Sequence, residues 1–439
     1  MPESSDSAPK RLAFNGYHRK QTAEPDWFLC QVGRGTPGGE YMRRFWQPIA
    51  YETELGDVPL RVRALGEDLV AFRDKSGRIG LLHLHCSHRN ASLEFGIIEG
   101  QGLRCCYHGR LFGVDGTILE ITGEPAAARY QSEASQGAYP THAFAGIVFA
   151  YMGPPEDMPV FPLYDHFKLP GVKLVPGIRW PLACNWIQIK ENAVDPHHTQ
   201  ILHVIPQLRG MDHFSNEFGN FPELTWAETP GGVMYLAARR VGENVWLRSA
   251  EILGANLHTI SSIFETGHER KPASLPFMSI WTLPVDDDHS IAFYLSHVTD
   301  KEEMPFDKRR YLESFGQTDD RPYRERQWLP GDHEAQSGQG PINVHALEQL
   351  GTQDRGIVLF RRQIRRGIEA VARGEIPPRG FYRKAEDIPP TFANDCVVAT
   401  DAVGGDPDDP AVLRRFADRM AGEYIKSPPM AALVQSLRA

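Results

Sequence analysis

Two short motifs that each pair a cysteine with a histidine constrain this chain more than any other feature of its sequence. Cys86 and His88 form the first motif, and Cys105 and His108, which begin after sixteen intervening residues, form the second. The chain has six cysteines in 439 residues, which is too few for the disulfide framework of a small secreted domain. Three of the six lie within residues 86–106 with histidines beside them, so we expect a metal site built from two loops.

The spacing within the two motifs indicates which metal they hold. A [2Fe–2S] cluster with mixed ligands takes two thiolates on one iron and two imidazoles on the other. One cysteine and one histidine from each loop supply that set, and each loop then binds both irons. The alternative is a structural zinc site, but zinc favours C-x2–4-C and H-x3–5-H pairs. The C-x-H spacing therefore favours the cluster, with Cys86, His88, Cys105 and His108 as its ligands.

The other cysteine and histidines near these motifs are interpreted as structural residues. His83 and His85 alternate with leucines, a pattern typical of one face of an ordinary strand. One of Cys105 and Cys106 fits the spacing to His108, and Cys105 is the better match. We therefore expect Cys106 to be a packing residue.

A second group of metal-ligand residues lies in the segment 185–203, which is helical in character. Pro196 should break this helix because proline has no amide proton to donate, and Asp195 can cap the turn that follows. Asp195, His198 and His203 form a D-x2-H-x4-H pattern. Two histidines and a carboxylate on one face of an iron leave adjacent positions open for O₂ and substrate, so the pattern favours Fe(II).

Two choices within this second site depend on more than local spacing. His197 competes with His198 as a ligand, and the wider spacing favours His198. The carboxylate ligand is either Asp195 or a residue from a distant segment. Our candidate is Asp332, because a distant carboxylate closes the triad without one helix wrapping around the metal. Glu334 is the nearest rival of Asp332.

The order of the expected elements predicts an α+β architecture. Residues 41–155 contain short apolar runs separated by turn signals, which predict a small antiparallel β domain. A proline-rich connector and the broken helix follow, and then longer strand-like runs that suit one large, curved antiparallel sheet. A helix with an apolar stripe from Ile357 to Val371 and a last helix that begins at Asp409-Pro410 close the chain. We expect an N-terminal arm at 1–40, the β domain at 41–155 and a second domain at 156–439.

Charge and hydropathy exclude several kinds of partner. The formal net charge is −9 and no long basic stripe is present, so we expect no nucleic-acid partner. The longest apolar run, around residues 143–152, is far shorter than the ~20 residues that a membrane span needs. The N-terminus lacks the apolar stretch of a signal peptide, so we expect a cytoplasmic protein. Arg239, Arg240 and Arg248 lie in expected strands, and we interpret them as solvated strand charges.

At these motifs the chain resembles the α subunits of the Rieske non-haem iron oxygenases, and in particular the phthalate dioxygenase-like branch. The likeness runs from about residue 41 to 373 and is carried by Cys86-Ser-His88-Arg89, Cys105-Cys106-Tyr107-His108-Gly109, Cys184-Asn185-Trp186, Glu191-Asn192 and Gly340-Pro341-Ile342. It implies a Rieske domain followed by a helix-grip catalytic domain (START/SRPBCC-like) with C-terminal helices. Arg110 departs from the family, which commonly has tryptophan there; the change concerns the surroundings of the cluster or the surface that docks the electron donor.

The resemblance also implies site residues and partners. It implies a mononuclear Fe(II) at His198, His203 and Asp332, with Asp195 and Asn192 in catalytic roles. In such enzymes an aspartate links a cluster histidine of a neighbouring subunit to an iron ligand, which implies a homotrimer or stacked trimers. The implied partners are a flavin or ferredoxin-type reductase, O₂ and a small aromatic substrate.

The function implied by this resemblance is that of the oxygenase component of a multicomponent system that hydroxylates an aromatic compound. By analogy with the branch, the leading substrate class is an aromatic carboxylate. An alternative within the same chemistry is an O- or N-demethylase of a methoxylated or methylated aromatic. A Rieske electron-transfer protein without oxygenase activity is the alternative from another class, but it would need no second iron.

Overall fold

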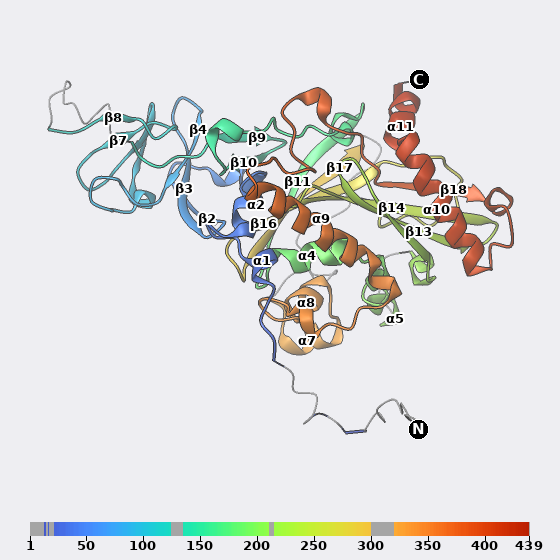
Figure 1. Cartoon of the computed structure of the whole chain (residues 1–439). Helices are drawn as coiled ribbons and strands as arrows, with labels where there is room; N and C mark the ends of the chain where they lie inside the picture. The colour runs from blue at the N-terminus through green and yellow to red at the C-terminus, as the bar shows by residue number, and fades with distance from the viewer. Residues whose placement is uncertain are drawn as a thin grey trace.

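The computed structural model shows a small β domain beside a larger sheet-and-helix domain (Figure 1). The part of the chain that it describes comprises residues 13, 14, 16, 22–123, 135–209, 215–299 and 320–438. The expected α+β fold, with a small antiparallel β domain followed by a large antiparallel sheet and C-terminal helices, is confirmed.

The N-terminal segment differs from the arm that the sequence predicts. Most of residues 1–21 lie outside the described residues. From Trp27 onward, however, the chain packs on the body through two short helices, α1 (Trp27–Cys30) and α2 (Pro37–Met42). Leu29 and Cys30 are fully buried, so this segment belongs to the main hydrophobic core and not to an arm. These two helices are too short for a helical repeat of apolar residues to be recognised in the sequence.

Three antiparallel sheets build the small domain. Their strand orders are β1-β10-β9, β2-β3-β4 and β5-β6-β7-β8. Apolar side chains from the second and third sheets form one core that also contains Cys86 and Cys105. The strands are β1 (Trp46–Tyr51), β2 (Leu60–Ala64), β3 (Glu67–Arg73), β4 (Ile79–His83), β5 (Ile97–Glu99), β6 (Gly102–Arg104), β7 (Leu111–Phe112), β8 (Ile118–Glu120), β9 (Thr141–Phe144) and β10 (Ile147–Tyr151).

One eight-stranded antiparallel sheet forms the centre of the larger domain. Its order is β11-β17-β16-β15-β14-β13-β12, and β18 also pairs with β14. The strands are β11 (Val172–Leu182), β12 (Glu223–Glu228), β13 (Gly232–Val241), β14 (Asn244–Leu253), β15 (Leu257–Ser261), β16 (Pro276–Pro284), β17 (Ser290–Thr299) and β18 (Asn394–Ala399). The strands from β12 to β17 are neighbours in the order of the chain, as in an antiparallel meander, whereas β11 pairs with β17, the last strand of that series.

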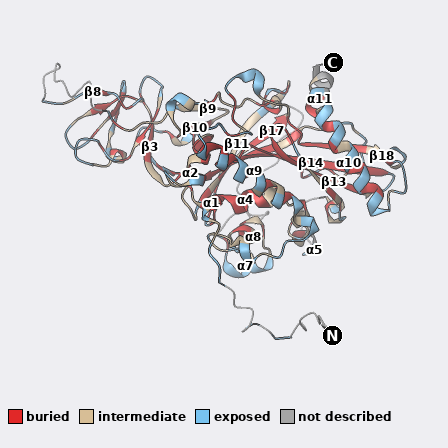
Figure 2. Ribbon diagram, viewed as in Figure 1, coloured by how far each residue is buried: buried red, intermediate tan, exposed pale blue. Residues whose placement is uncertain are grey.

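Helices cover both faces of this sheet. Met234 and Leu236 of β13 lie on one face and pack in a cluster with α10 (Pro410–Lys426). On the other face Val233 packs with α9 (Arg355–Ala372), and Trp226 donates a hydrogen bond to the carbonyl that ends α4 (Trp186–Ala193). Side chains alternate between faces along a strand, so both faces are buried, and Figure 2 shows the strands as the buried centre.

The two C-terminal helices follow their sequence signals. Phe360, Ile364 and Ile368 of α9 are fully buried, which confirms the predicted apolar stripe. The side chain of Asp409 accepts a hydrogen bond from the Ala411 amide at the start of α10, which confirms the predicted cap. The other α-helices of the described residues are α5 (Ile205–Leu208), α7 (Tyr323–Trp328), α8 (Asp332–Ser337) and α11 (Pro429–Arg438).

The interpretation of the strand arginines as solvated charges was wrong for two of the three. Arg239 and Arg248 are 1% and 5% exposed, whereas the side chain of Arg240 is 37% exposed and pairs with Asp408. Arg239 and Arg248 lie on the face of the sheet that α4 covers. Trp226 lies on this face and pairs with Tyr235 of β13. Because alternate residues of a strand share a face, Arg239 lies on the same face as Tyr235, and so does Arg248, which pairs with Ala237. Within the described residues, no helix is both long and apolar enough to cross a membrane.

Candidate metal centres

The two cysteine–histidine motifs lie on two loops that fold in the same way. The Asn90 amide donates to the carbonyl of Cys86 (2.9 Å), and the Gly109 amide donates to the carbonyl of Cys105 (3.1 Å). Asn90 and Gly109 have positive φ angles of 59° and 71°, which asparagine and glycine adopt most readily. In each loop the hydrogen-bonded turn therefore begins at the cysteine and ends one or two residues after the histidine.

The sulfur atoms of this site lie inside the domain and the imidazoles lie outside. Cys86 and Cys105 are 1% and 3% exposed, whereas His88 and His108 are exposed, with ring centroids 4.7 Å apart. Loss of hydration and the positive charge of Arg110 lower the pKa of His88, which favours the neutral imidazole that binds metal. Two buried thiols and two exposed imidazoles fit the mixed ligand set of a [2Fe–2S] cluster.

Two neighbouring residues differ from their expected roles. Cys106 is exposed, so the expectation that it packs in the interior was wrong. His83 is more than an ordinary strand residue, because its Nε2 lies 3.5 Å from the carboxylate of Glu67. Burial acts to raise the pKa of Glu67, but hydrogen bonds from His83 and Tyr139 outweigh it and lower the pKa to about 2. His85 contacts the carbonyl of Asn90 (3.1 Å).

The second group of ligands begins at the break in the helix that the sequence predicts. Helix α4 ends at Ala193, and a 3-10 turn, η5 (Pro196–Gln200), begins after Asp195. The side chain of Asp195 accepts a hydrogen bond from the His197 amide (3.0 Å), the usual bond of a capping carboxylate. Proline is tolerated at the first position of a helical turn because its missing amide proton has no partner there.

His198, His203 and Asp332 converge on one point between α4, η5 and α8. The Nε2 atoms of His198 and His203 lie 3.6 Å and 3.4 Å from the two carboxylate oxygens of Asp332. One donor atom from each of the three residues lies within 4.8 Å of the others. Two imidazoles and a carboxylate without a thiolate fit Fe(II) with open coordination positions.

Nearby groups orient these donors. The Nδ1 atom of His198 bonds to the backbone carbonyl of Asp195, which leaves Nε2 free for a metal. Burial lowers the pKa of His198, so its imidazole is neutral. The amide of Asn192 donates to Asp332 Oδ1 (3.4 Å). Asp195 thus contacts His198 through its backbone within one subunit, and its second carboxylate oxygen bonds to no other described residue.

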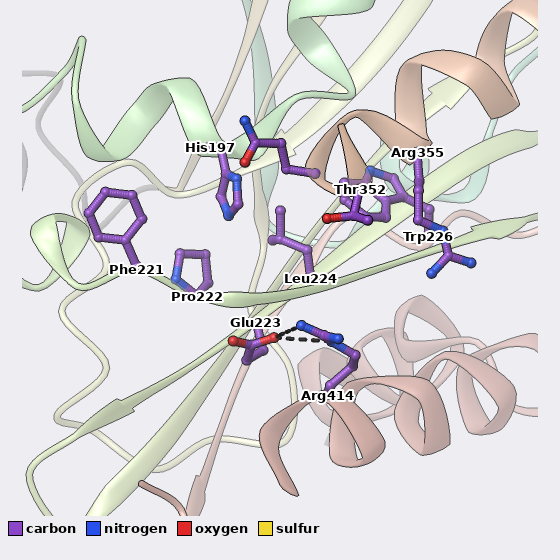
Figure 3. Close-up of a pocket in the computed structure, with 10 residues that line it drawn as sticks. His197, Phe221, Pro222, Glu223, Leu224, Trp226, Thr352, Arg355 and Arg414 are labelled. Carbon is purple, nitrogen blue, oxygen red and sulfur yellow. Dashed lines mark hydrogen bonds and ion pairs between the residues drawn. The ribbon is translucent and has the colours of Figure 1, made fainter. Parts of the chain in front are cut away.

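The two rival ligands face elsewhere. Glu334 forms ion pairs with Arg321 and Arg326 (2.9 and 2.7 Å) and is therefore engaged away from the triad. His197 lines a surface pocket of about 360 Å³. Figure 3 shows His197 in this pocket with Phe221 beside it, and with residues of β12, α9 and α10 on its other sides.

The sequence analysis missed two sets of buried charges in the larger domain. One is the pair Arg239 and Arg248 described above, and the other is Lys190 of α4, which is 0% exposed. Lys190 follows Trp186 by four residues and Ile187 by three, so it occupies the apolar stripe of its helix. That mismatch between a charged residue and an apolar position was the signal that the sequence offered.

Known proteins match this chain in domain type, sequence and fold. The Rieske [2Fe-2S] domain family matches residues 45–132. The chain is 41% identical to the oxygenase subunit of tert-butanol monooxygenase/tert-amyl alcohol desaturase from Aquincola tertiaricarbonis, with 86% of this chain and 84% of that protein covered. It is 38% identical to the α subunit of phenoxybenzoate dioxygenase from Ectopseudomonas oleovorans, with 82% and 89% covered.

Solved structures agree on the fold. Dicamba monooxygenase bound to dicamba superposes with a TM-score of 0.58 at 18% identity, covering 76% of this chain and 99% of that chain. NdmA from Pseudomonas putida CBB5 in its QL mutant form with caffeine gives 0.59 at 16% identity, with 80% and 94% covered.

A Rieske domain joined to a helix-covered antiparallel sheet with a histidine–carboxylate triad defines a two-centre iron enzyme. The chain belongs to the Rieske non-haem iron oxygenases, as an oxygenase (α) subunit. Its cofactors are accordingly a Rieske [2Fe–2S] cluster and a mononuclear iron, and its relatives are named as components of multicomponent systems.

Proposed function

We propose that this oxygenase component oxidises an aromatic carboxylate, and that Arg239 binds the carboxylate group of the substrate. The observation that carries this proposal is a buried guanidinium without a bonded carboxylate on the sheet face that α4 covers. The guanidinium of Arg239 lies 4.6 Å and 5.4 Å from the ring centroids of Trp246 and Phe218. Its Nε atom has no hydrogen-bond partner among the described residues.

The neighbouring charges leave this region positive. Arg248 donates to the carbonyls of Ser261 and Ser262 and lies 3.7 Å from the buried carboxylate of Asp395. Burial raises the pKa of Asp395 to about 6, whereas burial and the charge of Arg248 lower that of Arg239 to about 9. At neutral pH two guanidiniums face one carboxylate. A bidentate carboxylate would complete the set.

We assign the ligands as the sequence and geometry suggest. Cys86, His88, Cys105 and His108 hold the cluster, and His198, His203 and Asp332 hold the mononuclear iron. Fe(II) in a two-histidine, one-carboxylate site activates O₂ beside the substrate when electrons reach it from the cluster. Asn192 holds Asp332 in place through its hydrogen bond, and the Asp195 carbonyl fixes the tautomer of His198.

We further propose that Asp195 joins two subunits of a homotrimer. In Figure 1 the small domain with β7 and β8 lies at the far left, whereas α4 and α8, which flank the triad, lie below the centre of the larger domain. We infer that electrons reach the triad from the cluster of another subunit. The unshared carboxylate oxygen of Asp195 and the pocket around His197 supply a surface where the exposed histidines of another copy could bind. The electron donor is a reductase that draws on NAD(P)H, which suits a cytoplasmic location.

The test is a substrate screen with purified oxygenase, a surrogate ferredoxin–reductase pair and NADH. Phthalate, 3-chlorobenzoate and 3-phenoxybenzoate probe the carboxylate class, toluene and diphenyl ether are neutral aromatic counterparts, and tert-butanol probes the small alcohol in the name of one relative. We expect product from at least one carboxylate and none from its neutral counterpart. Product from tert-butanol and from none of the acids would contradict the proposed substrate class.

A further inference from the structure

A lysine of α4 and a histidine of β15 form a buried pair, and the lysine lies two residues before Asn192, which donates a hydrogen bond to Asp332 of the triad. Lys190 of α4 is 0% exposed, and its Nζ lies 2.9 Å from Nδ1 of His258 on β15 and 3.2 Å from the carbonyl of Ile280 on β16. These two contacts are its hydrogen bonds within the described residues. Both belong to uncharged acceptors, so the lysine has no carboxylate counter-ion in contact.

The surroundings of the pair are apolar. Ile189, Met278 and Ile280 belong to one hydrophobic cluster, with Ile260 packed against it. A lysine side chain in such a place costs folding free energy, and leucine or methionine would fill the same space at less cost. A costly group in the apolar layer next to a metal site suggests a function for that group.

His258 is the member of the pair whose pKa the triad carboxylate Asp332 affects. It is 8% exposed, and its Nε2 bonds to no described residue. The negative charge of Asp332 reaches it and acts to raise its pKa, although burial and the charge of Lys190 lower the pKa well below the ordinary value. An ammonium has no lone pair, so it must donate to Nδ1, and the ring proton of His258 then sits on Nε2.

The charge state of the pair follows from its burial. Burial lowers the pKa of Lys190 well below its ordinary value of 10.5, so the pair holds one extra proton at most and holds it loosely. The elements packed against α4 carry several titratable groups, among them Asp332, His333 and Glu334 from α8, His197 and His198 from η5, Arg361 from α9 and Cys30 from α1. Arg361 is neutralised by its ion pairs with Glu191 and Glu348.

We propose that Lys190 and His258 form a proton-donor pair for the oxygenation reaction, in which His258 Nε2 gives a proton to the reacting oxygen and Lys190 replaces it. This inference rests on the proposed function of the same site. Hydroxylation follows R–H + O₂ + 2e⁻ + 2H⁺ → R–OH + H₂O, and cis-dihydroxylation also consumes two protons for each O₂. The reductase supplies the electrons, and the pair supplies one of the two protons.

The pair loses one proton in each transfer, and the two residues share the change as follows. As the Nε2–H bond of His258 breaks, its proton passes to oxygen, and Nδ1 takes a proton from Lys190 Nζ. Lys190 is left as a neutral amine, and His258 remains neutral with its proton on Nδ1. The next proton from solvent restores the starting state before another turnover. In this scheme Lys190 is a positioning residue that acts through His258.

The experiment uses the holoenzyme with Lys190→Met and His258→Gln, and with His297→Gln as the matched control. His297 is a buried histidine on the next strand but one, and it lies on the opposite face of the sheet, where it contacts Ser279. Product, O₂ uptake and peroxide are measured with the substrate from the screen, and thermal unfolding is measured between pH 6 and 10. Removal of a general acid commonly slows a reaction by about 100-fold or more.

We expect Lys190→Met and His258→Gln to keep their iron, to lose roughly 100-fold in product formation and to release peroxide, while His297→Gln behaves as the wild type. Lys190→Met should unfold at the same or a higher temperature, because a buried ammonium is gone. Product yield per O₂ within twofold of wild type would overturn the inference. So would a lower unfolding temperature together with loss of the mononuclear iron, since Lys190 would then be structural.

The pH dependence of unfolding tests the pair without any substrate. Because the folded-state pKa of Lys190 lies below 10.5, the unfolded chain binds more protons between those two values, and the wild type gains stability relative to Lys190→Met as the pH rises. If the difference in stability between the wild type and Lys190→Met stays constant with pH, the pKa of Lys190 is not lowered in the folded state, and the inference fails. Failure of every substrate in the screen would contradict the proposed substrate class, and this measurement would still decide the pair.

Discussion

The two metal sites of this chain are built in opposite ways. All four proposed ligands of the cluster lie within Cys86–His108, on two loops of one small domain, and both histidines are exposed. The proposed iron ligands come from the broken helix and from α8, far apart in the chain, and His203 is 6% exposed. The first site can be recognised from spacing alone, whereas the second depends on the tertiary fold.

The difference suits the two tasks. A cluster that passes electrons to a separate molecule gains from exposed imidazoles, because transfer needs a short path between proteins. A site that activates O₂ gains from burial, because excluded water cannot compete for the open positions. The charges follow the same division: carboxylates of the small domain are paired, as Glu67 is, while several charged groups of the large sheet are buried with few partners.

The largest expected effect is the loss of one site without the other. His198→Ala should remove the mononuclear iron and abolish product formation, because two ligands cannot hold the metal against water. The cluster should keep its visible absorption, since it lies in the other domain. Iron analysis and the absorption spectrum measure both outcomes, with His197→Ala as the control. Loss of the cluster absorption in His198→Ala would contradict the separation of the two sites.

The link between the sites is the next test. Asp195→Asn should retain both metals and lose roughly 100-fold in turnover, as substitutions of groups that orient metal ligands commonly do. Rapid mixing of reduced enzyme with O₂ and substrate should show slow oxidation of the cluster. Asp409→Asn is the control, because Asp409 also caps a helical turn by accepting the amide two residues on. Normal cluster oxidation in Asp195→Asn would mean that this residue does not connect the sites.

Charge in the large sheet should affect substrate selection more than catalysis. Arg239→Met should raise the KM for a carboxylate substrate about 10- to 100-fold, which corresponds to the loss of a charged hydrogen bond. The neighbouring Arg240 is exposed and pairs with Asp408, so Arg240→Met should leave KM unchanged. Steady-state kinetics with both variants decide the point. An unchanged KM in Arg239→Met would remove Arg239 from the substrate site.

The smallest effect concerns stability and has opposite signs in the two domains. Burial raises the pKa of Glu251 to about 8, so the folded state binds more protons than the unfolded chain between about pH 4.5 and 8, and stability falls as the pH rises through that window. Glu251→Gln should therefore gain on the order of a few kcal/mol relative to wild type near pH 8. Chemical denaturation at pH 5 and 8 measures this difference.

Glu67→Gln supplies the contrast. The pKa of Glu67 is lowered to about 2, so its stabilising contribution is present above about pH 4.5 and is lost as the pH falls toward 2. This variant should be less stable than wild type at neutral pH. Equal pH dependence in the two variants would contradict the division between paired charges in the small domain and unpaired charges in the large sheet.

The same contrast explains how much could be predicted from the sequence. The cluster motif, the break at Pro196, the cap at Asp409 and the stripe of α9 all depend on residues close in the chain, and local spacing records them. Asp332 needed the family resemblance, because no local pattern distinguishes it from Glu334. The burial of Arg239, Arg248 and Lys190 could not be predicted, since the pairing of β13 with β14 and the packing of α4 decide it.

Cys106 is a residue for which the usual preference of its residue type gave a wrong prediction. Cysteine is commonly buried, but the turn that brings Cys105 and His108 together leaves the side chain between them on the outside. The constraint of the metal site outweighed the ordinary preference of the residue type. The helices at Trp27–Cys30 and Pro37–Met42 were missed because tertiary packing, not local periodicity, stabilises such short segments.

The most direct test of the two-site account is the metal content of anaerobically purified protein together with an EPR spectrum after dithionite reduction. The account predicts about three irons and two labile sulfides per chain, and the signal of a reduced Rieske cluster. Iron should fall by about one per chain in His198→Ala with that signal unchanged. Zinc in place of iron, with no EPR signal from the reduced protein, would contradict the account.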